Sequence, residues 1–145
     1  MTRLRSIFCG IVCLVVLTLS AAAAELRPHQ ASGGAQFISA TQFIGAGHAT
    51  HLGAYTEVGT VAFTPTNDPA VLRVDGANVY TAANGDQLYG SFTGELNGVT
   101  GAVTATITYA GGTGRFAGAT GSSALTGQML GGGALAVSVD GGLSY

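Results

Sequence analysis

The side chains that could do chemistry are few in this sequence, and three of them are histidines. His48 and His51 are three residues apart. That spacing would suit a shared metal ion on a helix, but on a strand it places the two side chains on opposite faces. His29 lies in a segment without periodicity and is given no role. We therefore expect no metal site, and we place His48 on the inner face of a strand, at the rim of a cavity.

Asp86 is the acidic residue whose position is most suggestive of a site. It shares its alternation with Leu88 and Phe92, which predicts a carboxylate at the inner rim. An aspartate that follows Asn84-Gly85 also fits the simpler role of completing a turn. We keep both interpretations.

Arg115 lies in the glycine-rich stretch 111–121 and could pair with a carboxylate such as Asp86. It could equally stack on Phe116 and hold the glycine loop in place. His48, Asp86 and Arg115 are thus the candidate ligand-binding residues at the cavity rim. No catalytic residue is assigned.

Motifs that would bind a cofactor or build a catalytic triad are missing from the sequence. Gly112-x-Gly114-x-x-Ala117 formally matches a dinucleotide fingerprint, but that motif needs a preceding strand, a following helix and a βαβ unit, and none is predicted. The sequence has no Gly-Lys-Ser/Thr phosphate loop and no Gly-x-Ser-x-Gly elbow. We expect no cofactor, and we interpret the glycine stretch as a tight turn.

The elements that must position these side chains are strands. Apolar and polar residues alternate with a period of two in several runs, as in strands with one buried face and one exposed face. The clearest runs are 86–96, 103–109 and 135–139. In a fourth run, 52–58, the pattern predicts that Leu52 and Val58 face inward while Tyr55 and Glu57 face outward.

Turn signals separate these runs. Asn84-Gly85 is typical of a two-residue hairpin turn, and that register would set Tyr80 opposite Tyr89 on the outer face. Asn97-Gly98 predicts another turn, and the prolines of 64–69 predict a loop. About eight strands joined by tight connections indicate an all-β, eight-stranded antiparallel up-and-down barrel.

The first residues predict export. Arg3 and Arg5 precede the apolar run 7–19, and small residues 21–24 follow, which is the order of a secretory signal peptide cleaved before Glu25. Cys9 and Cys13 would be removed with it. We expect a signal peptide at 1–24, a flexible leader at 25–35 and a barrel domain at 36–145, in a secreted or periplasmic protein without a membrane span.

Charge excludes several partners. After Glu25 the chain would carry three arginines, no lysine and seven acidic residues, so its net charge is 3 − 7 = −4. A basic surface for nucleic acid or for an anionic membrane is therefore missing.

One stretch resembles a known group of barrels. The run 109–121 (YAGGTGRFAGATG) is similar to the signature of dirigent proteins and of the allene oxide cyclase-like superfamily, and 45–53, 83–88 and a C-terminal Gly-x-x-Tyr are similar to secreted bacterial proteins of that group. The resemblance implies an eight-stranded barrel with an apolar cavity, often trimeric in the plant relatives. The glutamate, asparagine and proline of the plant cyclases have no matching motif in 25–45.

Two classes of function follow from this. The first is a non-enzymatic module that binds a small apolar ligand, or an oligomeric structural protein. The alternative is a cyclase-, isomerase- or dirigent-type protein that shapes a reactive intermediate in an apolar lumen with polar groups only at its rim. Tyr55, Tyr80 and Tyr89 on a weakly charged outer face predict self-association, in a trimer if the resemblance holds.

Overall fold

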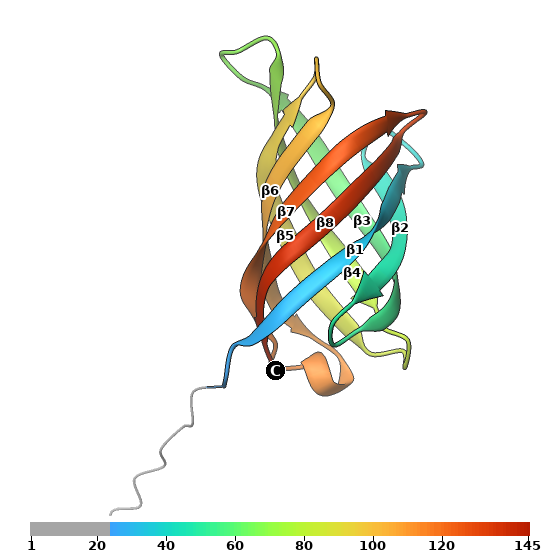
Figure 1. The fold of residues 1–145 in the computed structure, drawn as a ribbon, viewed down its shortest axis with the longest axis vertical. Coiled ribbons are helices and arrows are strands. Elements are labelled where there is room, and N and C mark those ends of the chain that lie inside the picture. The colour runs from blue at the N-terminus through green and yellow to red at the C-terminus, as the bar shows by residue number, and fades with distance from the viewer. Residues whose placement is uncertain (1–23) are drawn as a thin grey trace, which may run out of the picture.

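The computed structural model describes residues 24–145, which form one closed β-barrel (Figure 1). Each strand pairs antiparallel with the next one along the chain, and the last pairs with the first. The fold class predicted from the sequence, an eight-stranded antiparallel up-and-down barrel, is confirmed. The elements are β1 Arg27–Phe37, β2 Gln42–Ala49, β3 Gly53–Pro65, β4 Val71–Thr81, β5 Gln87–Asn97, β6 Ala102–Gly112, the 3-10 turn η1 Gly114–Phe116, β7 Thr120–Gly131 and β8 Ala134–Ser144.

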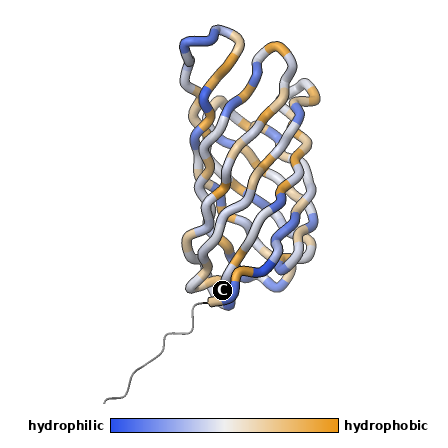
Figure 2. The backbone as a smooth tube through the Cα atoms, turned by 60° about the vertical axis from the view of Figure 1, so that its left-hand side comes forward, coloured by the Kyte–Doolittle hydropathy of each residue, from blue (hydrophilic) through white to orange (hydrophobic). Residues whose placement is uncertain are grey.

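The alternation of residue types explains why these segments are strands. In β6 the side chains of Val103, Ile107 and Tyr109 are buried in the lumen, whereas the threonines between them are exposed. Apolar and polar segments also alternate along the tube in Figure 2. The barrel interior is thus filled from one face of every strand, as closure requires.

The barrel begins earlier than the sequence predicts. Residues 25–35 were expected to be a flexible leader, but Arg27–Phe37 is β1, which pairs with β2 on one side and with β8 on the other. Its inward positions include Ala31, Gly33 and Ala35, which are too small to give a hydrophobic pattern. Backbone pairing on both edges holds this strand in place. The predicted signal peptide and its two cysteines lie outside the described residues, except for Ala24.

The predicted orientation of β3 was wrong. Tyr55 and Glu57 face the lumen, and Val58 is 56% exposed on the outside. The chain makes a turn just before the strand, where His51 has φ 75° and Gly53 has φ 68°. Two left-handed residues change the phase of the alternation, so that Leu52 is buried although its parity would place it with the exposed side chains.

The hairpin between β4 and β5 has a loop one residue longer than expected. The register pairs Thr81 with Gln87, and the Ala82 amide donates to the Asp86 carbonyl at 2.8 Å, which leaves three residues in the loop. Gly85 takes the left-handed conformation that such loops need. Tyr80 therefore lies opposite Leu88 inside the barrel, not opposite Tyr89 outside it, because a slip of one residue turns a strand over.

The two ends of the barrel differ. At the end where η1 lies beside the C-terminus, the lumen is filled by a buried cluster that includes Leu88, Phe116 and Leu143, each 0% exposed (Figure 1). At the opposite end, inward side chains such as Phe63 and Leu135 are partly exposed. The lumen is therefore closed at the η1 end and opens toward the loops at the other end. Among residues 24–145, no helix is long and apolar enough to cross a membrane.

Candidate functional site: a buried carboxyl in the barrel lumen

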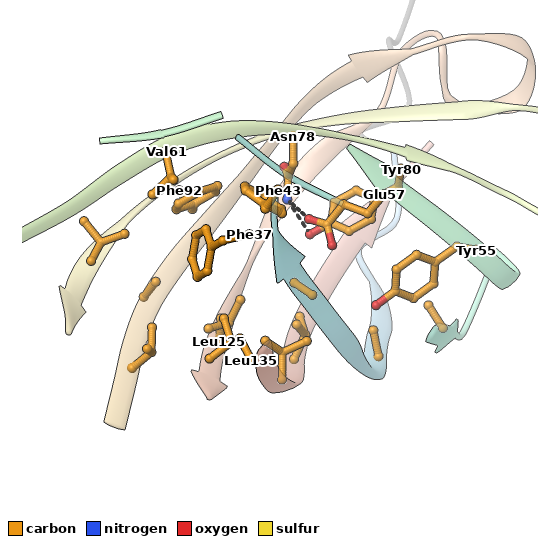
Figure 3. Close-up of a pocket in the computed structure, with 18 of the residues that line it drawn as sticks. Phe37, Phe43, Tyr55, Glu57, Val61, Asn78, Tyr80, Phe92, Leu125 and Leu135 are labelled. Atoms are coloured by element: carbon orange, nitrogen blue, oxygen red, sulfur yellow. Dashed lines mark hydrogen bonds between the residues drawn. The ribbon is translucent and has the colours of Figure 1, made fainter. Parts of the chain in front are cut away.

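A cavity of about 80 Å³ lies in the lumen. Toward the open end its walls are apolar and aromatic, with Phe37, Phe43, Val61 and Phe92 among the lining residues (Figure 3). Toward the closed end the lining becomes polar, and it includes Glu57, Asn78 and four aromatic residues that carry a polar atom. The cavity thus has an apolar upper part and a polar floor.

Glu57, Asn78 and Tyr80 form a hydrogen-bonded group on that floor, here called the lumen cluster. The side-chain amide of Asn78 donates to Glu57 Oε1 at 2.6 Å and to the Tyr80 hydroxyl at 2.8 Å (Figure 3). All three side chains are buried, and only 8% of Glu57 is exposed. Strand pairing fixes the arrangement, because Glu57 of β3 lies directly opposite Tyr80 of β4.

The burial of Glu57 changes its acidity. Removal of the carboxyl from water disfavours the charged form and raises the pKa of Glu57 from 4.5 to about 7, although hydrogen bonds from Asn78 and Tyr80 act in the opposite direction. This carboxyl therefore exchanges a proton near neutral pH. A perturbed acid in a cavity is a feature of functional sites.

Glycines make room for the cluster. A Cβ atom at Gly45 would lie 2.9 Å from Glu57 Oε2, and one at Gly90 would lie 2.4 Å from Asn78 Oδ1. On the neighbouring strands, Cβ atoms at Gly33 and Gly47 would lie 2.9 and 2.8 Å from the Tyr55 hydroxyl. The inward glycines of β1, β2 and β5 therefore leave the space that the polar side chains occupy.

Three tyrosines surround the floor of the cavity. The rings of Tyr55 and Tyr80 meet edge to face at 5.5 Å, and the Tyr80 ring lies 6.5 Å from that of Tyr109. Burial raises the pKa of Tyr55 and of Tyr109 to about 12, and that of Tyr80 well above its ordinary value. The Tyr109 hydroxyl donates to Ser123 Oγ at 3.3 Å. All three phenols stay neutral at physiological pH.

His29, given no role from the sequence, also lines the cavity. It is 3% exposed and packs edge to face on Tyr109 with ring centroids 5.4 Å apart. Burial, with a smaller effect of the neighbouring His51, lowers the pKa of His29 from 6.5 to about 4. The imidazole is therefore neutral at pH 7, so it cannot balance a negative charge in the lumen.

The residues predicted for the rim lie elsewhere. His48 is exposed on the outer face of β2, between Ser32 and Ala54, so its inward assignment was wrong. His48 was assigned inward because it shares its parity with Leu52. The turn with left-handed His51 and Gly53 shifts the alternation there, so parity with Leu52 does not give the face of His48. His48 and His51 do not combine with a third ligand, and residues 24–145 hold no group of three side chains suited to a metal ion.

Asp86 and Arg115 do come together, at the closed end of the barrel and outside the cavity lining. Arg115 Nε lies 3.7 Å from Asp86 Oδ2, and the Arg115 guanidinium also stacks over Phe116 at 4.8 Å and donates to the His51 carbonyl. The Asp86 amide donates to Asn84 Oδ1 at 3.0 Å, as in a simple turn. The structure thus gives both residues the local roles that the sequence left open, and a ligand role for them stays a prediction.

The lumen cluster did not stand out in the sequence, because polar residues of a strand are expected to face outward. On that expectation Glu57 and Tyr55 lie outside the barrel and apolar Val58 inside it. The glycines at 45, 47 and 59 carry a usable signal, because strand positions without side chains leave space that a neighbouring strand must fill.

The chain was also compared with known proteins. No protein-family model matches it, and no curated protein or solved structure matches it.

Proposed function

We propose that this protein binds a small, mainly apolar molecule in the barrel lumen, with a polar group of that molecule directed at Glu57. The observation that carries the proposal is the cavity itself, apolar at its open end and polar at its floor. A space of about 80 Å³ exceeds what one water molecule needs. Pockets of this kind, mostly apolar with a few fixed polar groups, are typical of small-molecule sites.

The test is a titration with straight-chain alkanols of increasing length, followed by backbone amide chemical shifts. We expect saturable shifts at lumen positions of β3, β4 and β6. Ala105→Leu, which places a larger side chain in the cavity wall, should weaken binding at least about tenfold. Thr106→Leu is the matched control, because Thr106 is the next residue of β6 and points outward. Equal binding by both variants, or shifts confined to the outer surface, would refute the proposal.

The titrating carboxyl favours a second candidate, a cofactor-free isomerase or cyclase. A carboxylate with a pKa near 7 can remove a proton next to a carbonyl group and return it elsewhere, while a tyrosine hydroxyl donates to the carbonyl oxygen. Glu57 and the hydroxyls of Tyr55 and Tyr80 supply these groups. The assay is exchange of the α-protons of cyclohexanone in deuterated water, which should slow about 10²–10⁴-fold in Glu57→Gln. If the protein does not accelerate this exchange, the catalytic candidate is refuted and only the binding function remains.

The barrel and the run 109–121 together support membership of the allene oxide cyclase-like and dirigent-like superfamily, which we include in the proposal. In this chain that run includes η1 and seats Phe116 in the closed end of the lumen. Its glycines at 111 and 114 have φ 84° and 56°, which explains why the stretch needs glycine.

Export and self-association complete the proposal. β1 begins at Arg27, so cleavage before Glu25 would leave every strand intact. Mass spectrometry of the protein from its host should find Glu25 as the first residue.

The two lumen tyrosines no longer support an outer interface, but Ile44, Val58, Val79 and Tyr89 form an apolar row across β2 to β5. We infer that this row mediates self-association. Sedimentation at micromolar concentration should show an oligomer that Val58→Lys dissociates, and a monomeric wild type would refute the inference.

A further inference from the structure

We propose that the lumen selects ligands that carry a positively charged amino group, placed against Glu57 on the floor of the cavity. This inference rests on the proposed binding function and specifies the chemical class of the ligand. The charges in and around the barrel, the hydroxyl groups at the floor and the apolar upper wall support it.

The lumen holds one acidic side chain and no cation to balance it. Neither lysine nor arginine lines the cavity, and its one imidazole, His29, is neutral at pH 7 because burial lowers its pKa to about 4. Ionised Glu57 therefore has hydrogen-bond donors but no counter-charge. A buried carboxylate in this state is unfavourable, and a cationic ligand would relieve it.

The arginines of the described chain are all engaged outside the lumen. Arg73 Nε lies 2.7 Å from Asp75 Oδ2 on the outer face, and Arg115 pairs with Asp86 at the closed end. Arg27 stacks over Tyr145 at 5.2 Å. Residues 24–145 contain no lysine, so none of their side chains can supply the missing cation without leaving another partner.

The floor also offers hydroxyl groups to an ammonium group. Tyr55 lies two residues before Glu57 on the same face of β3, and Tyr80 lies opposite Glu57 on β4 with its hydroxyl in the lumen cluster (Figure 3). A phenol oxygen can accept a hydrogen bond from an ammonium group. A carboxylate beside these hydroxyls therefore suits a cationic donor and disfavours an anion.

The remainder of the ligand must be apolar. Above the floor, Phe37, Phe43 and Phe92 are in edge contact, with centroids 6.2 Å apart for the first pair and 6.0 Å for the second. Leu125 and Leu135 close the opposite wall (Figure 3). An alkyl or aryl amine fits this order of surfaces, with its amino group at Glu57 and its hydrocarbon part toward the open end.

Proton release distinguishes a cationic ligand from any other. The titratable groups that face Glu57 are Tyr55 on its own strand, Tyr80 of β4, Tyr109 of β6 and His29 of β1, while β2 presents Gly45. Between pH 5 and pH 9 the tyrosines and His29 keep their charge state, so among these facing groups only Glu57 changes its protonation. An ammonium group stabilises the carboxylate, and below pH 7 its binding must expel the proton of Glu57.

The experiment is isothermal titration calorimetry at pH 6 with n-hexylamine, 1-hexanol and hexanoate. Each titration is done in two buffers of different ionisation enthalpy, so that the number of protons released is measured directly. We expect the amine to bind at least about tenfold more tightly than the alkanol, and the anion to bind weakest. Amine binding should release close to one proton, and alkanol binding about none.

Glu57→Gln keeps the shape of the side chain and removes its charge. It should lose both the preference for the amine over 1-hexanol and the proton release. Glu95→Gln, on the exposed face of β5, is the matched control and should behave as wild type. The proton count in the wild-type protein tests the proposal even if Glu57→Gln does not fold.

The outcomes separate the two levels of inference. Hexanol that binds in the lumen as tightly as the amine, or amine binding without proton release, would overturn the preference for cations and leave the binding function intact. If none of the three compounds binds, the proposed function itself is refuted.

Discussion

Replacement of Glu57 by glutamine should change how the stability of the barrel depends on pH. Burial raises the pKa of Glu57 from 4.5 in the unfolded chain to about 7 in the folded protein. Between these two values the folded state holds a proton that the unfolded state has lost, so the free energy of unfolding falls as pH rises. The difference of 7 − 4.5 corresponds to about 3 kcal/mol, because each pH unit is worth about 1.4 kcal/mol.

His29 acts in the opposite direction over nearly the same range. Its pKa falls from 6.5 in the unfolded chain to about 4 in the folded protein, so between these values the unfolded state holds the extra proton and stability rises with pH. The difference of 6.5 − 4 again corresponds to about 3 kcal/mol. In the wild type the two contributions nearly cancel between pH 4.5 and pH 6.5.

The assay is urea denaturation at half-unit steps from pH 4 to pH 8. Relative to wild type, Glu57→Gln should gain about 3 kcal/mol of stability between pH 4.5 and pH 7, because glutamine stays neutral in both states. Its amide oxygen can still accept from Asn78. His29→Gln should show the opposite trend and lose stability relative to wild type as pH rises through the same range.

The difference between wild type and each variant isolates one group from all other titrations. Glu95→Gln serves as the control, because it changes an exposed carboxyl of β5. If the curves of wild type and Glu57→Gln run parallel from pH 4 to pH 8, Glu57 has the same acidity in both states. Such a result would show that the lumen does not desolvate the carboxyl.

Three further perturbations test the parts of the barrel that surround the site. Gly45→Ala should lower the free energy of unfolding by about 1–3 kcal/mol in urea denaturation, because its Cβ would lie 2.9 Å from Glu57 Oε2. Gly98→Ala is the control, because its Cβ would meet its nearest neighbour only at 3.6 Å. Equal losses in the two variants would mean that the Glu57 carboxyl can move away from Gly45. Phe116→Ala should lower stability by about 3–5 kcal/mol and open the closed end, with a loss below 1 kcal/mol counting against its role as a plug. Asp86→Asn should change stability by less than about 1 kcal/mol and leave alkanol binding unchanged, because the ion pair with Arg115 is partly exposed; a strong loss of binding would restore Asp86 as a site residue.

The sequence alone was sufficient for the fold class. Regular alternation in 86–96, 103–109 and 135–139 predicted which face of each strand points inward. Most of the inward apolar residues of these runs line the cavity, whereas Leu88 and Ile107 are buried outside its lining and Asp86 does not reach it. Turn signals at 84–85, 97–98 and 64–69 each lie at a connection of the barrel, although Thr64 and Pro65 still belong to β3 and pair with β4. These features are local, because strand alternation and turn chemistry depend on neighbouring residues along the chain.

The candidate site depended on tertiary structure. Glu57 enters the lumen because two left-handed residues shift the phase of β3, and Tyr80 because one additional loop residue turns β4 over. Both effects concern a single residue, and in a period-two pattern a single residue decides which face is buried. The pKa values of Glu57 and His29 are even harder to predict from the sequence, because they are shifted only when the eight strands close and exclude water. The sequence therefore determined that a barrel would form, and only closure decided that its one enclosed carboxyl would lie among tyrosines.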